Sequence, residues 1–287
     1  MRLIHNTISL LGLTSILISP VAASAIQPAQ TRATTTDNYI AQTTTEDFVQ
    51  QGVQKLEIGD LRGAIEDFNQ AIKIEPNLAS AYFIRGQTYM LQGEFNKAIT
   101  DFDQAIEIDA NFAHSYNNRG VARLQMGNFE GAIADFNQAI EINPTLAMAY
   151  NNRGFIRLQM GNFEGAIADF NQAIEINPTL AMAYNNRGFA RMQQGDMQDA
   201  IADFNQALEN DPSDIMAYNN RGFAHLQQGN IQEAIANFNQ ALKIKPNYAQ
   251  AYENRGIAYL QQGDITDAIA DFNRAIKIKP NDAKAYN

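Results

Sequence analysis

Residues 123–155, RLQMGNFEGAIADFNQAIEINPTLAMAYNNRGF, return without a single change at residues 157–189, so a block of 33 residues occurs twice at an offset of 34. An isolated copy would leave the rest of the chain unrelated to it. Comparison at the same offset instead shows that the pattern continues on both sides of the copy, with glycine, proline, alanine and aromatic residues in register. The block is therefore a building unit, and an internal repeat determines the fold class.

The predicted units are 34 residues long and fill residues 45–282. They span 45–78, 79–112, 113–146, 147–180, 181–214, 215–248 and 249–282. Position 4 of each unit is aromatic, positions 8 and 15 are glycine, positions 20 and 27 are alanine, and position 24 is phenylalanine. Position 32 is proline in six units, which accounts for six of the eight prolines. Such spacing is typical of an array in which one supersecondary unit is stacked many times.

Each unit is expected to form two helices. Positions 2–14 form the first, which the glycine at position 15 ends, because glycine readily adopts the left-handed conformation that follows a helix. Positions 17–30 form the second, with apolar residues at a spacing of mostly three and four, typical of an amphipathic helix. Proline at position 32 prevents continuation. Small residues at 8, 20 and 27 let the two backbones approach, and aromatic side chains at 4 and 24 fill the space beside them.

This combination of an aromatic at position 4, glycine at 8, alanine at 20, an aromatic at 24 and proline at 32 resembles the tetratricopeptide repeat. The resemblance covers residues 45–282, with residues 283–287 as the start of an incomplete eighth repeat. It implies an all-α fold, an α-solenoid in which helix pairs form a right-handed superhelix. The first helices would line a concave groove, and the second helices would form the outer surface. One departure is that position 7, often leucine in the family, is arginine from the second unit to the seventh.

The segment before the repeats is expected to direct export. Residues 1–25 have the features of a secretory signal peptide, with a positive Arg2, an apolar run over residues 8–21 and small residues before the cleavage site. An anchoring helix is the alternative, but the run is short for a membrane span. Residues 26–44, rich in threonine, are expected to be a flexible linker. We predict an exported protein of bacterial type, periplasmic or secreted, with an internal lumen as a further possibility.

The composition limits the classes of partner. The formal net charge is −10 and the sequence pI is near 4.8, whereas binding to nucleic acid or to anionic lipid needs a basic surface. The chain has no cysteine, so its stability rests on a packed core without disulfides. We expect a protein or peptide partner, no nucleic acid, and no stable membrane span once the signal peptide is removed.

No catalytic or metal-binding constellation stands out. Two histidines remain after removal of the signal peptide, His114 and His225, more than three units apart, so a histidine-based metal site is not expected. Structural positions account for the glycines of the repeats, which leaves no phosphate-binding loop. Carboxylates recur at fixed unit positions, whereas a catalytic pair is normally unique in a chain. We therefore expect neither enzyme activity nor a cofactor.

The arginine at position 7 is expected to be partly buried, and a lone buried charge is costly, so it needs a partner. Position 23 supplies one, which is aspartate in six units and Asn237 in the other. The first unit has Gln51 at position 7 and no unit before it. We therefore expect each arginine to pair with position 23 of the preceding unit. The arginines at position 11, namely Arg123, Arg157 and Arg191, either pair with nearby carboxylates or attract an acidic partner.

Amides and apolar side chains share the face of the first helices that is expected to line the groove. An amide donates and accepts at once, so a series of asparagines could hold the backbone of an extended peptide, similar to the asparagine ladders of peptide-binding tetratricopeptide superhelices. Methionine and phenylalanine beside them suit adaptable apolar recognition. The alternative is that the apolar residues pack between adjacent first helices and that the asparagines only solvate the face. The candidates are Asn117, Asn118, Asn151, Asn152, Asn185, Asn186, Asn219, Asn220, Asn254, Met148, Met182, Met216, Phe155, Phe189 and Phe223.

These features together predict a non-catalytic interaction scaffold of an exported compartment, which binds a partner protein or an extended peptide in the groove. The alternative is a structural or assembly protein that forms homo-oligomers through the C-terminal end of the repeats. That end has no full capping helix in the sequence, because residues 283–287 amount to about one helical turn.

Overall fold

Residues 44–280 of the 287 are described by the computed structural model, and every regular element in that range is a helix, as the all-α prediction requires. The predicted signal peptide, all but the last residue of the predicted linker and the predicted start of an eighth repeat lie outside the described residues. None of the described helices combines the length and the apolar character that a membrane crossing needs.

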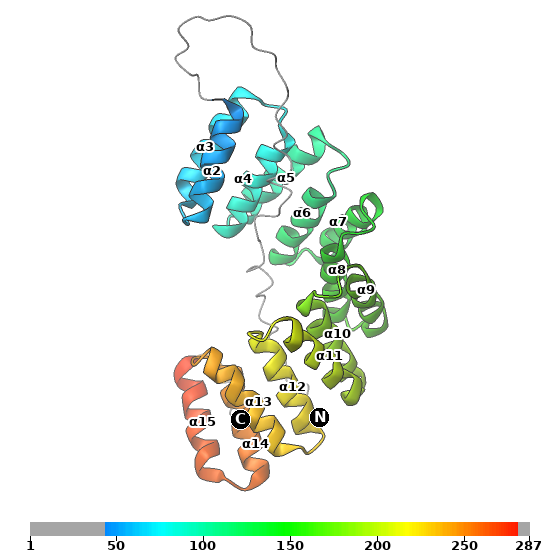
Figure 1. Ribbon diagram of the computed structural model, residues 1–287, viewed down its shortest axis with the longest axis vertical. Helices are drawn as coiled ribbons and strands as arrows, with labels where there is room; N and C mark the ends of the chain where they lie inside the picture. Colours follow the sequence, from blue (N-terminus) through cyan, green and yellow to red (C-terminus); the bar gives the residue numbers. More distant parts are fainter. Residues whose placement is uncertain (1–43, 281–287) are drawn as a thin grey trace, which may run out of the picture. The chain divides into compact units, whose positions relative to one another are not determined.

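The described chain divides after Asn143 into two compact bodies, each a series of helix pairs (Figure 1). The N-terminal body contains α2 (Thr45–Glu57), α3 (Leu61–Ile74), α4 (Ala79–Leu91), α5 (Phe95–Ile108), α6 (Ala113–Gln125) and α7 (Phe129–Ile142). The C-terminal body contains α8 (Ala147–Gln159), α9 (Phe163–Ile176), α10 (Ala181–Gln194), α11 (Met197–Asn210), α12 (Ile215–Gln227), α13 (Ile231–Ile244), α14 (Ala249–Gln262) and α15 (Ile265–Ile278). Within a body, each helix packs chiefly on its neighbours in the sequence, as in a repeat solenoid.

The helix boundaries agree with the predicted unit positions to within one residue. Second helices begin at position 17 and end at position 30, as predicted; α9 covers Phe163–Ile176. First helices begin at position 1 rather than 2, because the residue at position 34 already supplies a carbonyl to the first turn. In α8, the Ala149 backbone N–H donates to the Leu146 carbonyl at 2.9 Å.

Glycine at position 15 forms the turn inside each pair. Gly161 has a φ of +76°, in the left-handed region that glycine enters without strain. The second helix then starts from a side-chain cap, in which Oδ1 of Asn162 accepts a hydrogen bond from the Gly165 backbone N–H at 2.9 Å. The turn and the cap together fix the angle at which α9 returns along α8.

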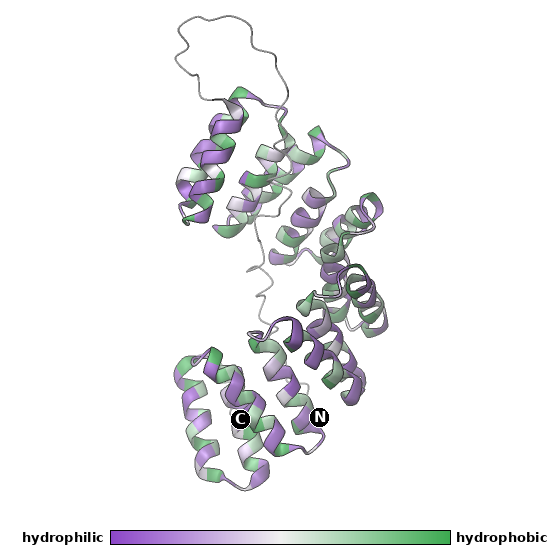
Figure 2. Cartoon of the chain, in the orientation of Figure 1, coloured by the Kyte–Doolittle hydropathy of each residue, from purple (hydrophilic) through white to green (hydrophobic). Residues whose placement is uncertain are grey.

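The two helices of a pair touch where position 8 meets position 24. A Cβ atom added to Gly154 would lie 2.8 Å from Cε1 of Phe170, closer than packed carbon atoms approach. Phe170, Ala166 and Ala173 are fully buried. The prediction that small residues allow close approach beside an aromatic ring is therefore confirmed. Figure 2 shows apolar and polar residues interspersed along the helices, as expected for helices with one buried face.

Candidate partner-binding surface

An arginine–aspartate–arginine triad joins the two helices of a pair. Between α8 and α9, Arg153 donates from Nη2 to Oδ1 of Asp169 at 2.6 Å and from Nε to Oδ2 at 3.0 Å. Nη1 of Arg157 donates to the same Oδ2 at 2.8 Å. The Asp169 side chain is 5% exposed, so two cations offset the loss of its hydration. The Arg153 guanidinium also lies 5.5 Å from the centroid of the Tyr150 ring, within the range of a cation–π contact.

This triad recurs along the chain. It comprises Arg119, Asp135 and Arg123 in the α6–α7 pair, and Arg187, Asp203 and Arg191 in the α10–α11 pair. Arg85–Asp101 and Arg255–Asp271 are single ion pairs, and Lys55 lies 2.7 Å from Asp67 in the first pair. For Arg123, Arg157 and Arg191, the interpretation that position 11 pairs with a nearby carboxylate is therefore confirmed.

The predicted partner of the position-7 arginine was placed in the wrong unit. The arginine pairs with position 23 of its own unit, 16 residues further on, and not with position 23 of the unit before. The reason is local: positions 7 and 23 flank the glycine and the phenylalanine that touch inside the pair. Sequence reasoning had placed the ion pair between units, where the structure shows a different contact.

Position 25 provides the contact between consecutive units. Nη1 of Arg187 donates to Oδ1 of Asn171 in the preceding pair at 2.7 Å. The residues that accept in this way are Asn69, Asp103, Asn171, Asn205 and Asn239. The sequence contains a signal for them that the prediction did not use, because position 25 is asparagine or aspartate in every unit. Five arginines thus join their own helix pair to the preceding one: Arg85, Arg119, Arg187, Arg221 and Arg255.

The α12–α13 pair departs from this arrangement. Asn237 replaces the aspartate, so Arg221 donates from Nε to an amide oxygen at 2.7 Å instead of to a carboxylate. His225 replaces the second arginine, and its buried Nδ1 has no hydrogen-bond partner among the described residues. Burial lowers the pKa of His225, and the charge of Arg221 lowers this pKa further, while Glu233 acts in the opposite direction. In the described part of the chain, this pair therefore carries one half-buried arginine without a carboxylate partner.

The predicted asparagines lie between neighbouring first helices. Nδ2 of Asn186 in α10 donates to Oδ1 of Asn151 in α8 at 3.0 Å, and Asn151 is 1% exposed. The equivalent bonds are Asn220 to Asn185 at 3.1 Å and Asn254 to Asn219 at 2.9 Å. In α6, Nδ2 of Asn117 donates to Oδ1 of Asn118 at 3.1 Å.

These amide bonds give the asparagines a structural role inside the chain. Asn117, Asn185, Asn186, Asn219, Asn220 and Asn254 are buried like Asn151, and Asn118 and Asn152 are half-buried. A buried amide that is bonded to its neighbour has fewer donors and acceptors left for a ligand. Recognition of a peptide backbone by these asparagines stays a prediction.

The predicted apolar contacts are all half-buried. They are Met148, Met182, Met216, Phe155, Phe189 and Phe223. Phe189 packs on the clusters around Leu158 and Met192, so one side of its ring belongs to the core. Sδ of Met182 lies 3.4 Å from Nδ2 of Asn151. The first helices therefore present partly accessible methionine and phenylalanine side chains beside a row of amides.

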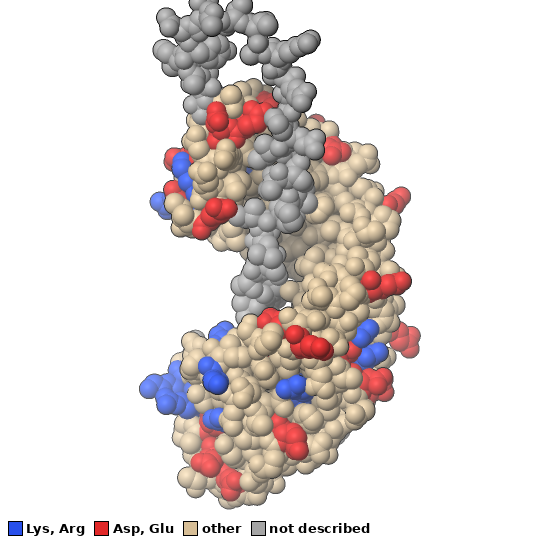
Figure 3. Space-filling model, in the orientation of Figure 1, with Lys and Arg blue, Asp and Glu red and all other residues tan. Residues whose placement is uncertain are grey.

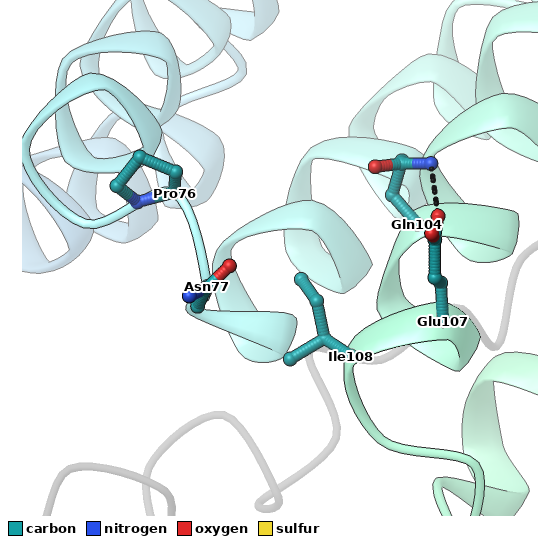
Figure 4. Close-up of a pocket in the computed structure, with 5 residues that line it drawn as sticks. All are labelled: Pro76, Asn77, Gln104, Glu107 and Ile108. Carbon is teal, nitrogen blue, oxygen red and sulfur yellow. Dashed lines mark hydrogen bonds between the residues drawn. The ribbon is translucent and has the colours of Figure 1, made fainter.

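The described residues form no cluster of metal ligands, and one hollow on the N-terminal body lacks an acid–base pair. No three histidine, aspartate or glutamate side chains in residues 44–280 are grouped so that they could hold a metal ion. A hollow lies beside the turn between α3 and α4, lined by Pro76, Asn77, Gln104, Glu107 and Ile108 (Figure 4). Nε2 of Gln104 donates to Oε2 of Glu107 at 2.9 Å there. With a single carboxylate and no nucleophile among these side chains, the hollow offers no acid–base pair.

Family models described as tetratricopeptide repeat or TPR repeat match the chain over a continuous stretch from residue 54 to residue 283. The matched segments are 54–93, 86–127, 113–146, 136–168, 156–195, 179–246 and 219–283. Consecutive segments overlap, as expected when one short unit recurs along a chain.

Known proteins share this repeat. Tetratricopeptide repeat protein 36 of Danio rerio is 49% identical over 49 residues, which is 17% of this chain and 26% of that protein. The match therefore spans about a quarter of that relative. A chain in the crystal structure of the APC/C hetero-tetramer Cut9-Hcn1 superposes with a TM-score of 0.70 at 20% identity, over 85% of this chain and 52% of that chain.

A second solved structure is YrrB, described as a TPR protein with an unusual peptide-binding site. It superposes with a TM-score of 0.50 at 23% identity, over 63% of this chain and 93% of that chain. Both superpositions concern the fold, because fold similarity does not carry a binding site with it. The sequence period, the helix pairs and the matched family models agree, and the chain belongs to the tetratricopeptide-repeat family.

Proposed function

We propose that this protein is a non-catalytic scaffold that holds an extended segment of a partner protein along its first helices. The fold itself supports protein–protein interaction in general. The observation that carries the finer proposal is a methionine and a phenylalanine, both half-buried, repeated at one period on α8, α10 and α12. Flexible thioethers beside aromatic rings adapt to varied apolar side chains.

The charge distribution supports a partner segment that is apolar or neutral at this surface. Helices α8, α10 and α12 contain no aspartate or glutamate. Four of their arginines are occupied by Asp169 and Asp203. A charged segment would lose hydration there, and Arg221 is the one arginine of these helices that pairs with amides instead of a carboxylate. Figure 3 shows acidic and basic side chains scattered over a mostly uncharged visible face.

The asparagines have one of two roles in this proposal: they hold the first helices in register, or they contact the partner directly. Their mutual bonds hold α8, α10 and α12 in register. That register sets the spacing of the methionines and phenylalanines from one helix to the next. YrrB, with its described peptide-binding site, is a precedent for peptide recognition on this fold.

Met148, Met182 and Met216, all changed to glutamine, provide the test. Glutamine has a similar length and keeps the helix, but it replaces an apolar surface with an amide. The bait is the protein from residue 26 onward, exposed to an extract of the exported compartment of the source cell. We expect a captured partner to be lost from the triple variant while its helical circular dichroism is unchanged.

A matched control changes Ala168, Ala202 and Ala236 to glutamine. These alanines are exposed on the second helices α9, α11 and α13, so the control adds the same amides on another face. Equal capture by both triple variants would refute binding at the methionines. A third variant with Asn118, Asn152, Asn186 and Asn220 changed to alanine tests whether the amides are needed: unchanged capture would remove them from the proposal, both as framework and as direct contacts.

The proposal includes export, supported by Arg2, the apolar run over residues 8–21 and the small residues Ala23 and Ala25. Mass spectrometry of the protein isolated from the source cell tests this step. A mature chain that begins at Ile26 is the expected result. A chain that keeps residues 1–25 would count against export through signal cleavage.

A further inference from the structure

The last helix pair of the described chain exposes a set of large apolar side chains, which we call the end face. It consists of Leu260 in α14 and Ile265, Ile269, Phe272 and Ile276 in α15. Leu260 is 48% exposed, Ile265 61%, Ile269 54% and Ile276 38%, and Phe272 is half-buried. Several large apolar side chains exposed on one helix pair indicate an interaction site.

The same unit positions are covered one pair earlier. Leu226, Ile235 and Leu242 occupy the positions of Leu260, Ile269 and Ile276, and they are only 3%, 9% and 8% exposed. Phe238, the counterpart of Phe272, is fully buried. Helix α14 provides this cover, for Leu242 clusters with Ala251 and Tyr252. The end face therefore has the composition of a surface that packs on another helix.

The opposite end of the repeats is unlike it. In α2, positions 3, 6, 7 and 10 are Asp47, Gln50, Gln51 and Gln54, and all four are exposed. In α14, these positions carry alanine, asparagine, arginine and alanine, which pack on the preceding pair. Contact between the end face and α2 of another copy would remove a carboxylate and three amides from water opposite isoleucines, which is costly. Head-to-tail stacking of copies is therefore disfavoured.

Two end faces, by contrast, fit each other in an antiparallel arrangement. The α15 side chains follow one another at intervals of four, three and four residues, so they form one stripe along the helix. Two such helices related by a two-fold axis place Ile265 opposite Ile276 of the second copy, and Ile269 opposite Phe272.

Charge favours the same arrangement. The exposed residues Asp264 and Asp267 lie at the start of α15, and the exposed residues Arg274 and Lys277 lie towards its end. An antiparallel pair brings each acidic start beside a basic end, and opposes the helix dipoles favourably. A parallel pair would place like charges together. Basic side chains gather beside this part of the C-terminal body in Figure 3.

We propose that the end face is a self-association surface, through which two copies of this chain form a two-fold dimer by antiparallel packing of α15 on α15. The end face comprises only five large apolar side chains, so we expect association of the weak, reversible class. It is independent of the proposed partner surface on α8, α10 and α12. Loss of partner capture and loss of self-association can therefore be observed separately.

Sedimentation equilibrium of the protein from residue 26 onward gives the first measurement. We expect a mass that rises from one copy towards two with concentration. Ile269→Lys places a charge at the centre of the stripe and should weaken association by about tenfold or more, which corresponds to 1.4 kcal/mol or more. Because Ile269 is already exposed, the fold should survive, and helical circular dichroism checks this. Ile58→Lys, at an 81% exposed isoleucine in the N-terminal body, is the matched control and should leave the mass unchanged.

Disulfide trapping tests the orientation, since the chain contains no other cysteine. A mixture of Ile265→Cys and Ile276→Cys variants, distinguished by mass, should form mixed dimers in preference to dimers of either variant alone. Preferential like-with-like dimers would overturn the antiparallel arrangement. A constant mass of one copy at all concentrations would overturn the dimer, and would leave the chain's own residues 281–287 or another protein as the cover. A dimer unaffected by Ile269→Lys would place self-association elsewhere.

Discussion

Asn237→Asp should stabilise the α12–α13 pair, whereas Asp203→Asn should destabilise the α10–α11 pair by a larger amount. The chain itself supplies the comparison, because the two pairs are consecutive and differ at the centre of the triad. Asp203 accepts from Nη2 of Arg187 at 2.6 Å and from Nη1 of Arg191 at 2.8 Å. Asn237 accepts a single hydrogen bond at 2.7 Å, from Nε of Arg221.

The magnitudes follow from these contacts. Hydrogen bonds to charged groups contribute about 1.5–3 kcal/mol each, and neutral ones about 1 kcal/mol. Asp203 is 4% exposed on its side chain, so solvent screens its pairs weakly. Its replacement by asparagine leaves two arginines without a carboxylate, and we expect a loss of about 2–3 kcal/mol. Asn237→Asp gains one charged partner, but it loses the hydrogen bond that Nδ2 of Asn237 donates to the Glu233 carbonyl at 2.8 Å and desolvates a new carboxylate. We therefore expect a gain of about 1 kcal/mol at most.

Urea unfolding combined with amide hydrogen exchange measures both effects. Exchange is needed because the units of a solenoid open locally, so a change in one pair should appear in its own helices first. Gln232→Glu makes the same amide-to-carboxylate change at an exposed position of α13, and should alter stability by about 0.5 kcal/mol at most. Faster exchange in α12 and α13 of Asn237→Asp would refute the reasoning, as would unchanged exchange in Asp203→Asn.

Two further predictions concern the glycines at positions 8 and 15 and the effect of acid. Gly154→Ala should lower the free energy of unfolding by about 2–3 kcal/mol, because the new methyl group would overpack against Phe170. Gly161→Ala has open space around it but a φ of +76°, so it should cost about 1–2 kcal/mol. Thermal unfolding of both variants gives the order of the two losses, and the reverse order would contradict the packing argument. Burial lowers the pKa of His114 and of His225 below the ordinary value of 6.5, so their neutral forms stabilise the fold above that pH. This contribution should be lost as the pH falls through the lowered values. The urea midpoint should therefore fall less between pH 7 and pH 5 when both histidines are changed to glutamine, and an equal fall in the two proteins would contradict the prediction.

Most of the fold could be predicted because each unit contains its own signals for where helices begin, end and pack. The glycine at position 15 adopts a positive φ, as at Gly161, and the second helices occupy the expected positions, as at Phe163–Ile176. These local signals recur every 34 residues, so a coincidental residue in one unit is recognised by comparison with the other units. Local propensity and packing agree, which is the condition under which sequence patterns are informative.

The candidate site was less predictable because it depends on which surfaces meet. The arginine at position 7 was expected to reach position 23 of the preceding unit, and it pairs within its own unit instead, as Arg153 does with Asp169. In a periodic sequence, every candidate partner has an equivalent residue 34 positions away. The sequence alone therefore does not distinguish a contact inside a unit from a contact between units. The asparagines raise the same difficulty. Their sequence pattern is the same whether Asn186 binds a ligand or, as in the structure, donates to Asn151.

The contacts between pairs have a consequence for the length of the chain. Removal of residues 181–214 would take out α10 and α11 and bring α12 onto α9. Arg221 would then meet Asn171 in place of Asn205, and Asn220 would meet Asn151 in place of Asn185, each the same residue type as before. The contacts between consecutive pairs are therefore interchangeable. A gene that gained or lost one 34-residue unit would encode a longer or shorter protein, and the new junction would already have its hydrogen-bond donors and acceptors in place.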